Sequence, residues 1–169
     1  MQEKRYGKYR GMVLNNIDPE QRGRLLVQVP DVLGLGTSSW AMPCVPMAGQ
    51  QMGAYFVPLI GSGVWVEFEG GDIDYPIWAG GFWGAASELP KMALAGLPVS
   101  PNIVLQTTGQ NTFVISDLPG PTGGIMLKSP TGASIIVNDT GIYITNGKGA
   151  SITLTGPTVN INNGALAIT

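Results

Sequence analysis

Hydrophobic and polar residues alternate along the last third of the chain, in short runs separated by Gly, Pro or Asn. Alternation with a period of two gives an extended strand one apolar face and one polar face. The pattern predicts strands at 103–107, 112–116, 125–128, 134–137, 142–145, 151–155 and 158–162. It also repeats, because Gly-Ala-Ser-Ile at 132–135 returns at 149–152, and Asn146-Gly147 returns as Asn163-Gly164. This 17-residue repeat indicates a repetitive β structure whose units cover one another's apolar faces.

Each repeat unit contributes two strands, and each strand offers two aliphatic side chains on one face. These aliphatic positions are Ile125, Leu127, Ile135, Val137, Ile142, Ile144, Ile152, Leu154, Val159 and Ile161. A single ribbon of this kind would leave its apolar face and its edges open to water. Association of several chains around one axis would bury the aliphatic rows, and three chains form the simplest closed prism. These residues are therefore predicted to form the core of a trimeric shaft, with a monomeric sheet packed on the rest of the chain as the alternative.

The first half of the chain predicts a second, different all-β structure. Short apolar or alternating runs at 11–15, 23–29, 40–46, 64–69 and 76–83 are separated by turn-forming residues such as Asp-Pro and Gly-Gly-Asp. Several short strands in succession are typical of a small closed barrel. The next segment carries three prolines and no clear period, with a short helical turn expected near 91–95. The predicted division is a barrel domain at 1–84, a linker at 85–101 and a repetitive β-helix or β-prism at 102–169.

The composition argues against catalysis and metal binding. The chain has no histidine, which removes the commonest general acid–base group and the commonest transition-metal ligand. Its one cysteine, Cys44, lies among prolines and apolar residues and is predicted to be a small buried hydrophobe rather than a nucleophile. For the acidic cluster of Glu67, Glu69, Asp72 and Asp74, a structural role is favoured over hydrolysis or cation binding. No enzyme activity, no metal and no cofactor are predicted.

Charge is low and unevenly spread. The net charge is −2, so no broad attraction to nucleic acid or to an anionic membrane is expected. Six of the nine basic residues lie within the first 24 positions, a pattern typical of a solvated edge strand. Four tryptophans could form a stacking platform for single-stranded nucleic acid, although core and interface roles are favoured. The chain begins without an apolar signal segment and has no run long enough to span a bilayer, which predicts assembly in the cytoplasm.

A set of short motifs runs through the first half of the chain in a fixed order. They are Tyr9-Arg10-Gly11-x-Val13, Asp18-Pro19, Gly23-Arg24-Leu25-x-Val27-x-Val29-Pro30, Trp40-Ala41, Ala48-Gly49, Pro58-x-x-Gly61-x-Gly63-Val64-x-Val66-x-Phe68-Glu69-x-Gly71-Asp72 and Pro76-x-x-x-Gly80-x-x-Trp83. In this order they closely resemble the N-terminal OB-fold domain of phage baseplate assembly protein V, the central spike of contractile tails. They are similar also to the corresponding module of VgrG, the spike of type VI secretion systems. The last third resembles this family in being a Thr-, Asn- and Gly-rich β-prism that follows the barrel, but it shares no specific motif with it.

The resemblance implies an intertwined homotrimer in which three OB-fold barrels form a collar and three tails wind into a spike. The collar would dock on a separate hub protein, with Arg5, Lys8 and Arg10 as possible hub contacts. Sheath contraction in a phage tail or a related injection particle would then drive the spike through the target envelope, which the protein would touch only transiently. No lysozyme domain follows the barrel, and a chain without histidine lacks the ligands for the iron-binding tip of some phage spikes.

Two further expectations complete the sequence-based description. A separate PAAR-type tip protein is expected at the C-terminal end, where the strand pattern is still running. The alternative function is an OB-fold binding module for single-stranded nucleic acid or oligosaccharide, in which the tail serves as an oligomerising stalk.

Overall fold

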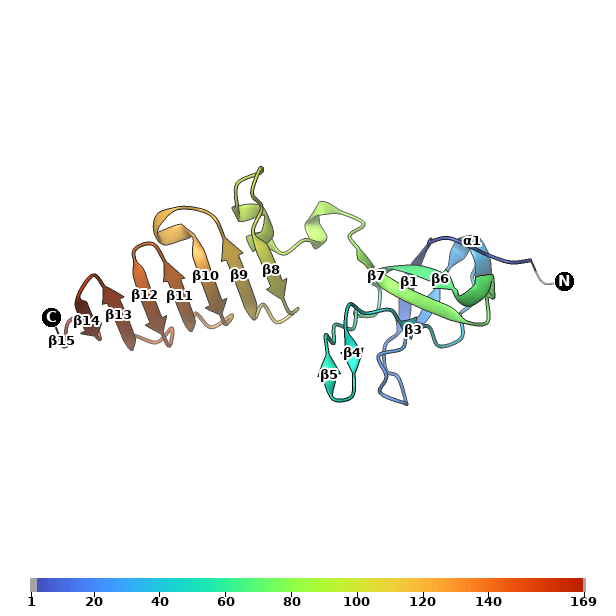
Figure 1. The fold of residues 1–169 in the computed structure, drawn as a ribbon, viewed down its shortest axis with the longest axis horizontal. Coiled ribbons are helices and arrows are strands. Elements are labelled where there is room, and N and C mark those ends of the chain that lie inside the picture. The colour runs from blue at the N-terminus through green and yellow to red at the C-terminus, as the bar shows by residue number, and fades with distance from the viewer. Residues whose placement is uncertain (1–2, 169) are drawn as a thin grey trace. The chain divides into compact units, whose positions relative to one another are not determined.

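The protein divides into two units whose regular elements are mainly β-strands (Figure 1). The computed structural model describes residues 3–168, apart from the side chain at position 167. The first unit ends at Glu88 and the second begins at Leu89, a division that lies within the segment predicted as a linker. This segment contains two short 3-10 helices, η2 (Ala86–Glu88) and η3 (Lys91–Ala95), of which η3 is the helical turn expected near 91–95.

The first unit is a five-stranded sheet that closes on itself. Its strands are β1 (Tyr9–Asn15), β2 (Leu26–Gln28), β3 (Met42–Pro43), β6 (Gly63–Phe68) and β7 (Pro76–Phe82), in the order β2-β1-β6-β7-β3. Neighbours are antiparallel except for β3 and β7, which are parallel. The backbone N–H of Leu25 donates to the Ala41 carbonyl at 3.1 Å, and that of Ala41 donates to the Leu25 carbonyl at 2.7 Å. These two bonds join the outer strands, so the predicted closed barrel is confirmed.

Alternation along the strands fills the barrel with aliphatic side chains. In β6, Val64, Val66 and Phe68 are buried, whereas Trp65 and Glu67 between them lie on the outer side and are only half-buried. The complete core consists of Val13, Leu25, Val27, Val29, Ala41, Val64, Val66, Phe68 and Trp78. β-branched residues predominate in it because they pack well on a pleated surface. The indole N–H of Trp78 donates to the Gly23 carbonyl at 3.0 Å, which satisfies the one polar atom of that buried side chain.

Two details of the barrel differ from the sequence-based expectation. Pro30 does more than end β2, because it is the first residue of a one-turn helix, α1 (Pro30–Leu33). Proline suits that position, since the first residues of a helix need no N–H donor. The edge-strand interpretation of the basic N-terminal segment was wrong for Arg10, because β1 lies between β2 and β6 in the sheet.

A small hairpin was missed entirely by the strand pattern. It consists of β4 (Ala48–Gly49) and β5 (Met52–Gly53), which pair with each other in a separate two-stranded sheet. Two residues a strand are too few to show any alternation. The prediction that Cys44 is buried was also wrong, since its side chain is exposed. The backbone N–H of Cys44 donates to the Trp78 carbonyl at 2.9 Å and so continues the edge strand, in which alternation directs Pro43 and Val45 inward and Cys44 outward.

The second unit is one antiparallel sheet of eight strands in chain order, β8 to β15. The strands are β8 (Ile103–Gln106), β9 (Thr112–Ser116), β10 (Gly124–Lys128), β11 (Ser134–Asn138), β12 (Gly141–Thr145), β13 (Ser151–Thr155), β14 (Thr158–Ile161) and β15 (Leu166–Ile168), with a 3-10 turn η4 (Gly120–Thr122) before β10. All seven predicted strands are confirmed to within two residues, and β15 is additional. Each strand pairs with the next one, so within one chain the unit is a meander and not a coiled β-helix.

Two glycines allow the strands of this meander to begin tightly against their neighbours. Gly141 has φ +155°, and a Cβ added there would lie 2.2 Å from the Leu154 carbonyl oxygen. Gly124 has φ +86°, and a Cβ there would lie 2.0 Å from the Val137 carbonyl oxygen. Any larger residue would push the adjacent strand away, so these glycines permit the regular spacing of the sheet.

Candidate oligomerisation surface

One face of the second unit carries two continuous rows of apolar side chains. The hydrogen-bonded register places each apolar residue directly opposite the next along the sheet. The first row is Ile103, Ile115, Ile125, Val137, Ile142, Leu154, Val159 and Ile168. The second row is Leu105, Phe113, Leu127, Ile135, Ile144, Ile152, Ile161 and Leu166. All ten residues predicted for the shaft core lie in these two rows, and every position of both rows is apolar.

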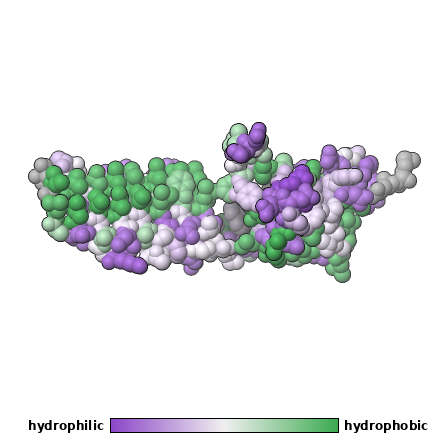
Figure 2. Space-filling view, turned by 90° about the horizontal axis from the view of Figure 1, so that it is seen from below, coloured by the Kyte–Doolittle hydropathy of each residue, from purple (hydrophilic) through white to green (hydrophobic). Residues whose placement is uncertain are grey.

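Most of this apolar face is uncovered in a single chain. Eleven of the sixteen residues of the two rows are exposed, from 36% at Ile142 through 49% at Leu127 to 62% at Ile103, and the other five are half-buried. Figure 2 shows the side chains as a continuous hydrophobic band along one side of the sheet. A soluble monomer seldom exposes so long a contiguous apolar surface, and such a patch marks an interaction site. We call this surface, defined by the two rows, the apolar face.

The opposite face of the same sheet has a different composition. It is apolar near β9, where Val114 is only 2% exposed, and becomes polar toward Thr153 and Asn160. The amide of Asn138 donates to the Pro121 carbonyl at 3.3 Å, and the Gly120 N–H donates to an Asp139 carboxylate oxygen at 3.1 Å. These contacts hold the η4 loop against β11. Among the described residues, the large exposed apolar side chains of the sheet lie on the apolar face.

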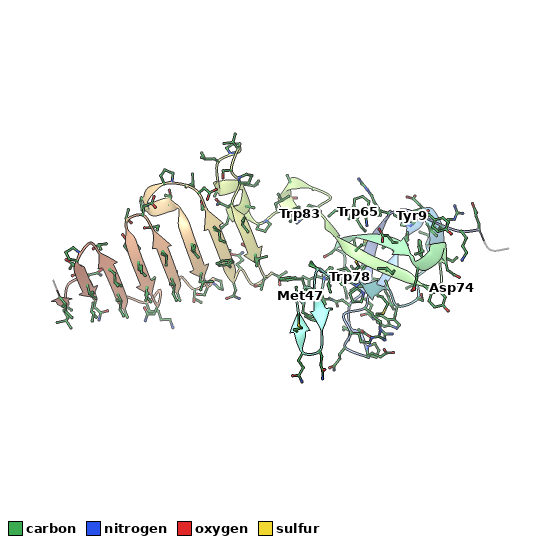
Figure 3. The ribbon with its side chains drawn as sticks, viewed as in Figure 1. Tyr9, Met47, Trp65, Asp74, Trp78 and Trp83 are labelled. Carbon is green, nitrogen blue, oxygen red and sulfur yellow. The ribbon has the colours of Figure 1, made fainter. Side chains whose placement is uncertain are left out.

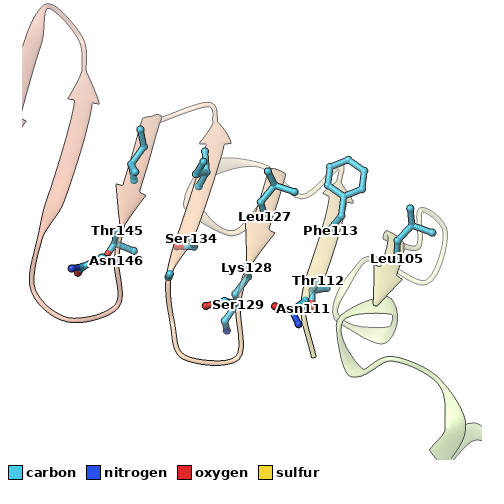
Figure 4. A pocket seen from close by; sticks show the side chains of 13 residues that line it. Leu105, Asn111, Thr112, Phe113, Leu127, Lys128, Ser129, Ser134, Thr145 and Asn146 are labelled. Atoms are coloured by element: carbon cyan, nitrogen blue, oxygen red, sulfur yellow. The ribbon is translucent and has the colours of Figure 1, made fainter. Parts of the chain in front are cut away.

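A shallow hollow of about 720 Å³ lies on the apolar face across β8 to β12. Its floor includes Leu105, Phe113 and Leu127 from three successive strands, whose side chains project from the same side of the sheet in Figure 4. Hydroxyl and amide groups such as those of Thr112 and Asn146 form its polar border. The only titratable side chain in the lining is that of Lys128. The hollow is thus shaped for apolar packing and offers no pair of groups for acid–base chemistry.

The acidic cluster of the first unit is partly paired with basic side chains from the N-terminal segment. The ammonium of Lys8 contacts the Glu67 carboxylate, and that of Lys4 lies 3.7 Å from an Asp72 oxygen. The other Asp72 oxygen accepts the Asp74 N–H at 3.1 Å. No group of three or more possible metal ligands occurs in the described part of the chain. Within residues 3–168, no helix combines the length and the apolar character that a membrane span requires.

The three residues predicted as hub contacts lie along one segment but in different surroundings. Arg5 pairs with Glu3 at 2.8 Å, and Lys8 pairs with Glu67. The guanidinium of Arg10 lies over two aromatic rings, 5.7 Å from the Trp65 centroid and 5.3 Å from that of Phe82 (Trp65 is labelled in Figure 3). Stacking of this kind holds a cation in place on the barrel surface.

Asp18 and Arg24, which both lie in the sequence motifs, form a nearly buried ion pair. The Arg24 guanidinium donates to Asp18 Oδ1 at 2.7 and 3.1 Å, and the two side chains are 3% and 12% exposed. The N–H groups of Glu20, Arg22 and Arg24 also donate to the Asp18 carboxylate at 3.0, 2.8 and 3.2 Å. The hydrogen bonds from the Arg24 side chain are the main cause that holds the pKa of Asp18 well below its ordinary value, with the backbone donors adding to them. The carboxylate thereby fixes the loop between β1 and β2.

We expect Asp18→Asn to destabilise the barrel in a pH-dependent manner. A lowered pKa in the folded state means that the ionised group stabilises the fold above its unfolded pKa of about 3.9. This contribution disappears as the pH falls through that value toward the lower folded pKa. The melting temperature of the variant should therefore lie below that of the wild type at pH 7, and the gap should narrow below about pH 4. Thermal unfolding followed by circular dichroism across this range measures the gap.

Asp31→Asn provides the control, because Asp31 is an exposed carboxylate of the same unit at the start of α1. Its melting temperature should stay near that of the wild type at every pH. A gap for Asp18→Asn that persists unchanged at low pH would show that the charge of Asp18 does not contribute.

Two comparisons with known protein families account for most of the chain. Residues 9–83 match the type VI secretion system/phage-baseplate injector OB domain. Residues 102–167 match the phage baseplate V C-terminal trimerisation domain. The chain belongs to the phage baseplate V family. This identifies the closed barrel as the family's OB domain and the eight-stranded sheet as its trimerisation domain. A search of curated proteins gave no match.

The family assignment agrees with the resemblance seen in the motifs of the first half and extends it to the last third. Members of the baseplate V family are structural proteins of baseplates and injectors. Sequence reasoning missed six members of the apolar face, namely Ile103, Leu105, Phe113, Ile115, Leu166 and Ile168. They lie outside the repeat, although the alternation around 103–107 and 112–116 already contained the first four, and no strand was predicted for the last two. It also missed the contact between Asp18 and Arg24, for which the only signal was their shared motif.

Proposed function

We propose that this baseplate protein is the homotrimeric central spike of a contractile tail or injection particle. The observation that carries the proposal is the pair of uninterrupted apolar rows that run across all eight strands of the second unit, with eleven of their sixteen side chains exposed. Three such sheets, each turned with its apolar face toward a common axis, form a prism with both rows inside. The match of this unit to a family of trimerisation domains supports the same stoichiometry.

Burial of these rows supplies a strong driving force for assembly. Complete burial of an exposed aliphatic side chain contributes about 1.5–3 kcal/mol, so a half-exposed one gains roughly half of that amount. This contribution is repeated along both rows. The predicted boundaries fit the assembly, with an OB-fold collar domain at 1–84, a linker at 85–101 and a trimeric shaft at 102–169.

The surface outside the rows suits a shaft that passes through an envelope. Beyond Ser100 the only charged residues are Asp117, Lys128, Asp139 and Lys148. The remaining polar positions of the second unit are mainly hydroxyl and amide side chains, which cost less to desolvate than charges. Puncture of the target envelope by sheath contraction is the mechanical role that we assign to this shaft. No catalytic step or cofactor is included in the proposal.

We assign the two ends of the spike to separate partner proteins. The basic N-terminal segment, with Arg5, Lys8 and Arg10, would contact a hub or baseplate protein. Lys8 is half-exposed even in its pair with Glu67, so its ammonium can still interact with an acidic partner. At the other end, β15 pairs only with β14 among the described strands. Its free edge and the ends of the apolar rows would be covered by a PAAR-type tip protein.

The alternative function as a nucleic-acid or oligosaccharide module receives less support from the tryptophans. Trp78 is buried in the core, and Trp65 packs on Phe82 with their ring centroids 5.1 Å apart. Trp40 lies under the Arg24 guanidinium, 5.4 Å from its ring centroid. Only Trp83 is largely exposed, at 62%. A stacking platform needs several exposed rings side by side, and these four side chains do not supply them.

Contractile particles purified from the source organism test the spike and its hub contact together. We expect three copies of the chain in each particle, counted by quantitative mass spectrometry against the other baseplate proteins. The double variant Lys8→Glu/Arg10→Glu should be lost from the particles by tenfold or more, because charge reversal at an interface costs at least about 1.4 kcal/mol. The purified variant should still form a trimer by light scattering.

Lys91→Glu/Lys148→Glu is the matched control, since it reverses two exposed charges outside the proposed hub contact. This variant should be incorporated at the wild-type level. Incorporation of the Lys8→Glu/Arg10→Glu variant at the wild-type level would show that the basic segment does not contact the hub. Absence of the wild-type chain from such particles would contradict the spike assignment.

A further inference from the structure

The first unit carries an exposed apolar patch that the barrel core does not need. It is formed by Met47 and Met52 of the hairpin segment and by Tyr55 and Phe56 after it, which are 51%, 58%, 73% and 64% exposed. We call these four residues the hairpin patch. They border a pocket of about 400 Å³ whose lining also includes Trp78 (Met47 and Trp78 are labelled in Figure 3). Large exposed Met, Tyr and Phe side chains beside a pocket are typical of protein–protein contact surfaces.

The hairpin patch itself contains no charge. Residues 32–66 include no Asp, Glu, Lys or Arg, and the one charged residue in the lining of the neighbouring pocket is Arg22, whose guanidinium pairs with Glu20 at 3.1 Å. Depletion of charge together with exposed Met and aromatic side chains marks the buried centre of an interface rather than its border. A surface that fits the patch is therefore mainly apolar.

The hairpin itself is poorly supported within one chain. β4 and β5 pair only with each other, through the positions Ala48 with Gly53 and Gly49 with Met52. An isolated two-stranded hairpin is marginally stable in water and gains stability when another surface covers it. A partner that covers the hairpin patch would therefore also fix the hairpin.

We propose that the hairpin patch of each chain is covered by the OB-fold unit of a neighbouring copy of the same chain. The inference rests on the trimer proposed above. β7 ends at Phe82 and β8 begins at Ile103, so a connection of twenty residues tethers each barrel to the trimeric sheet. Tethering of this kind raises the effective concentration of one barrel for another to roughly the millimolar range. A second copy also meets the chemical requirement, since its OB-fold unit exposes further apolar side chains outside the patch, such as those of Leu59 and Ile60.

Three-fold symmetry determines which surfaces of neighbouring chains meet. In a cyclic trimer two different surfaces of neighbouring chains meet, unlike the self-complementary contact of a two-fold dimer. The pocket beside the hairpin, whose lining includes the exposed side chains of Met52 and Phe56, supplies one of these surfaces. An apolar side chain from another part of the neighbouring OB-fold unit would enter this pocket, and the contact would repeat around the ring.

Photo-crosslinking of the full chain tests the contact directly. The substitution Phe56→benzoylphenylalanine keeps an aromatic side chain at an exposed position, so the barrel should fold normally. After irradiation we expect covalent species of two and three times the chain mass of 17.7 kDa on a denaturing gel. Tyr75→benzoylphenylalanine is the control, since Tyr75 is 63% exposed and follows Asp74 at the end of the unit away from Met47 (Figure 3). This control should give only uncrosslinked chains.

Light scattering on the same samples separates the possible failures. A trimer that gives no crosslink at position 56 would overturn the hairpin contact and leave the spike proposal intact. This is the result expected if a different protein covers the hairpin patch. A monomer would overturn both proposals. Met52→Glu in the crosslinking chain should lower the yield roughly tenfold or more, because a carboxylate placed in an apolar contact is costly to desolvate. An unchanged yield would also contradict the contact.

Discussion

Ile152→Asp should convert the trimer into single chains or aggregates at micromolar concentration. Ile152 lies in the middle of the second row, hydrogen-bonded in register between Ile144 and Ile161. In the proposed trimer three carboxylates would enter a core without partners, at a cost of about 3–5 kcal/mol for each chain. The apolar burial of the isoleucine, about 1.5–3 kcal/mol when complete, is lost as well. Mass by light scattering should fall from three times the chain mass of 17.7 kDa to that of one chain.

Thr153→Asp is the matched control for this experiment. Thr153 is the next residue of the same strand and lies on the opposite face, in register with Tyr143. A carboxylate there remains near water, so the trimer should persist. Equal loss of the trimer in both variants would indicate general damage to the sheet. A stable trimer of the Ile152→Asp variant would show that the apolar face is not the interface.

Removal of residues 132–169 should abolish the trimer and leave a folded barrel. The deletion takes away five of the eight strands and with them most of both apolar rows. The barrel core is formed by residues between Val13 and Trp78, so it does not depend on the deleted segment. Light scattering should report a monomer at low concentration. The fluorescence of buried Trp78 and a cooperative thermal transition should show that the barrel is intact.

A shorter deletion of residues 162–169 controls for the loss of a chain end. It removes only β15 and leaves seven strands with fourteen of the sixteen residues of the two rows, so this shortened chain should still form a trimer. A trimer that survives the long deletion would mean that the barrels associate on their own. Loss of the barrel's thermal transition would mean that the first unit needs the second one to fold.

Much of the second unit could be predicted because its structure is local in sequence. Each strand pairs with the next one along the chain, and the turns between them contain Gly, Asn or Pro. Alternation alone therefore placed Ile135 and Ile144 on the same face. The repeat drew attention to ten residues of the apolar face, whereas Phe113 and Ile115 were overlooked because they precede the repeated segment.

The barrel was harder to predict in detail, because its decisive contacts join distant residues. The bonds between Leu25 and Ala41 that close the sheet leave no periodic signal. Cys44 was placed inside because its neighbours are apolar, yet its place on an edge strand directs its side chain outward. The hairpin of β4 and β5 is too short for any pattern, and it carries the patch from which the contact between copies is inferred.

The sequence by itself determined the all-β composition of both halves, the strands of the second unit and the apolar character of one face. Period-two alternation is a property of the backbone within each strand, so it can be read without knowing the strand's partners. The tertiary structure alone decided the register that aligns Leu127, Ile135 and Ile144 into an unbroken row, and the closure of the barrel. It also decided which apolar side chains remain exposed, because exposure depends on what the rest of the chain covers. An apolar residue becomes a candidate interface residue only when the folded chain has left it open to water.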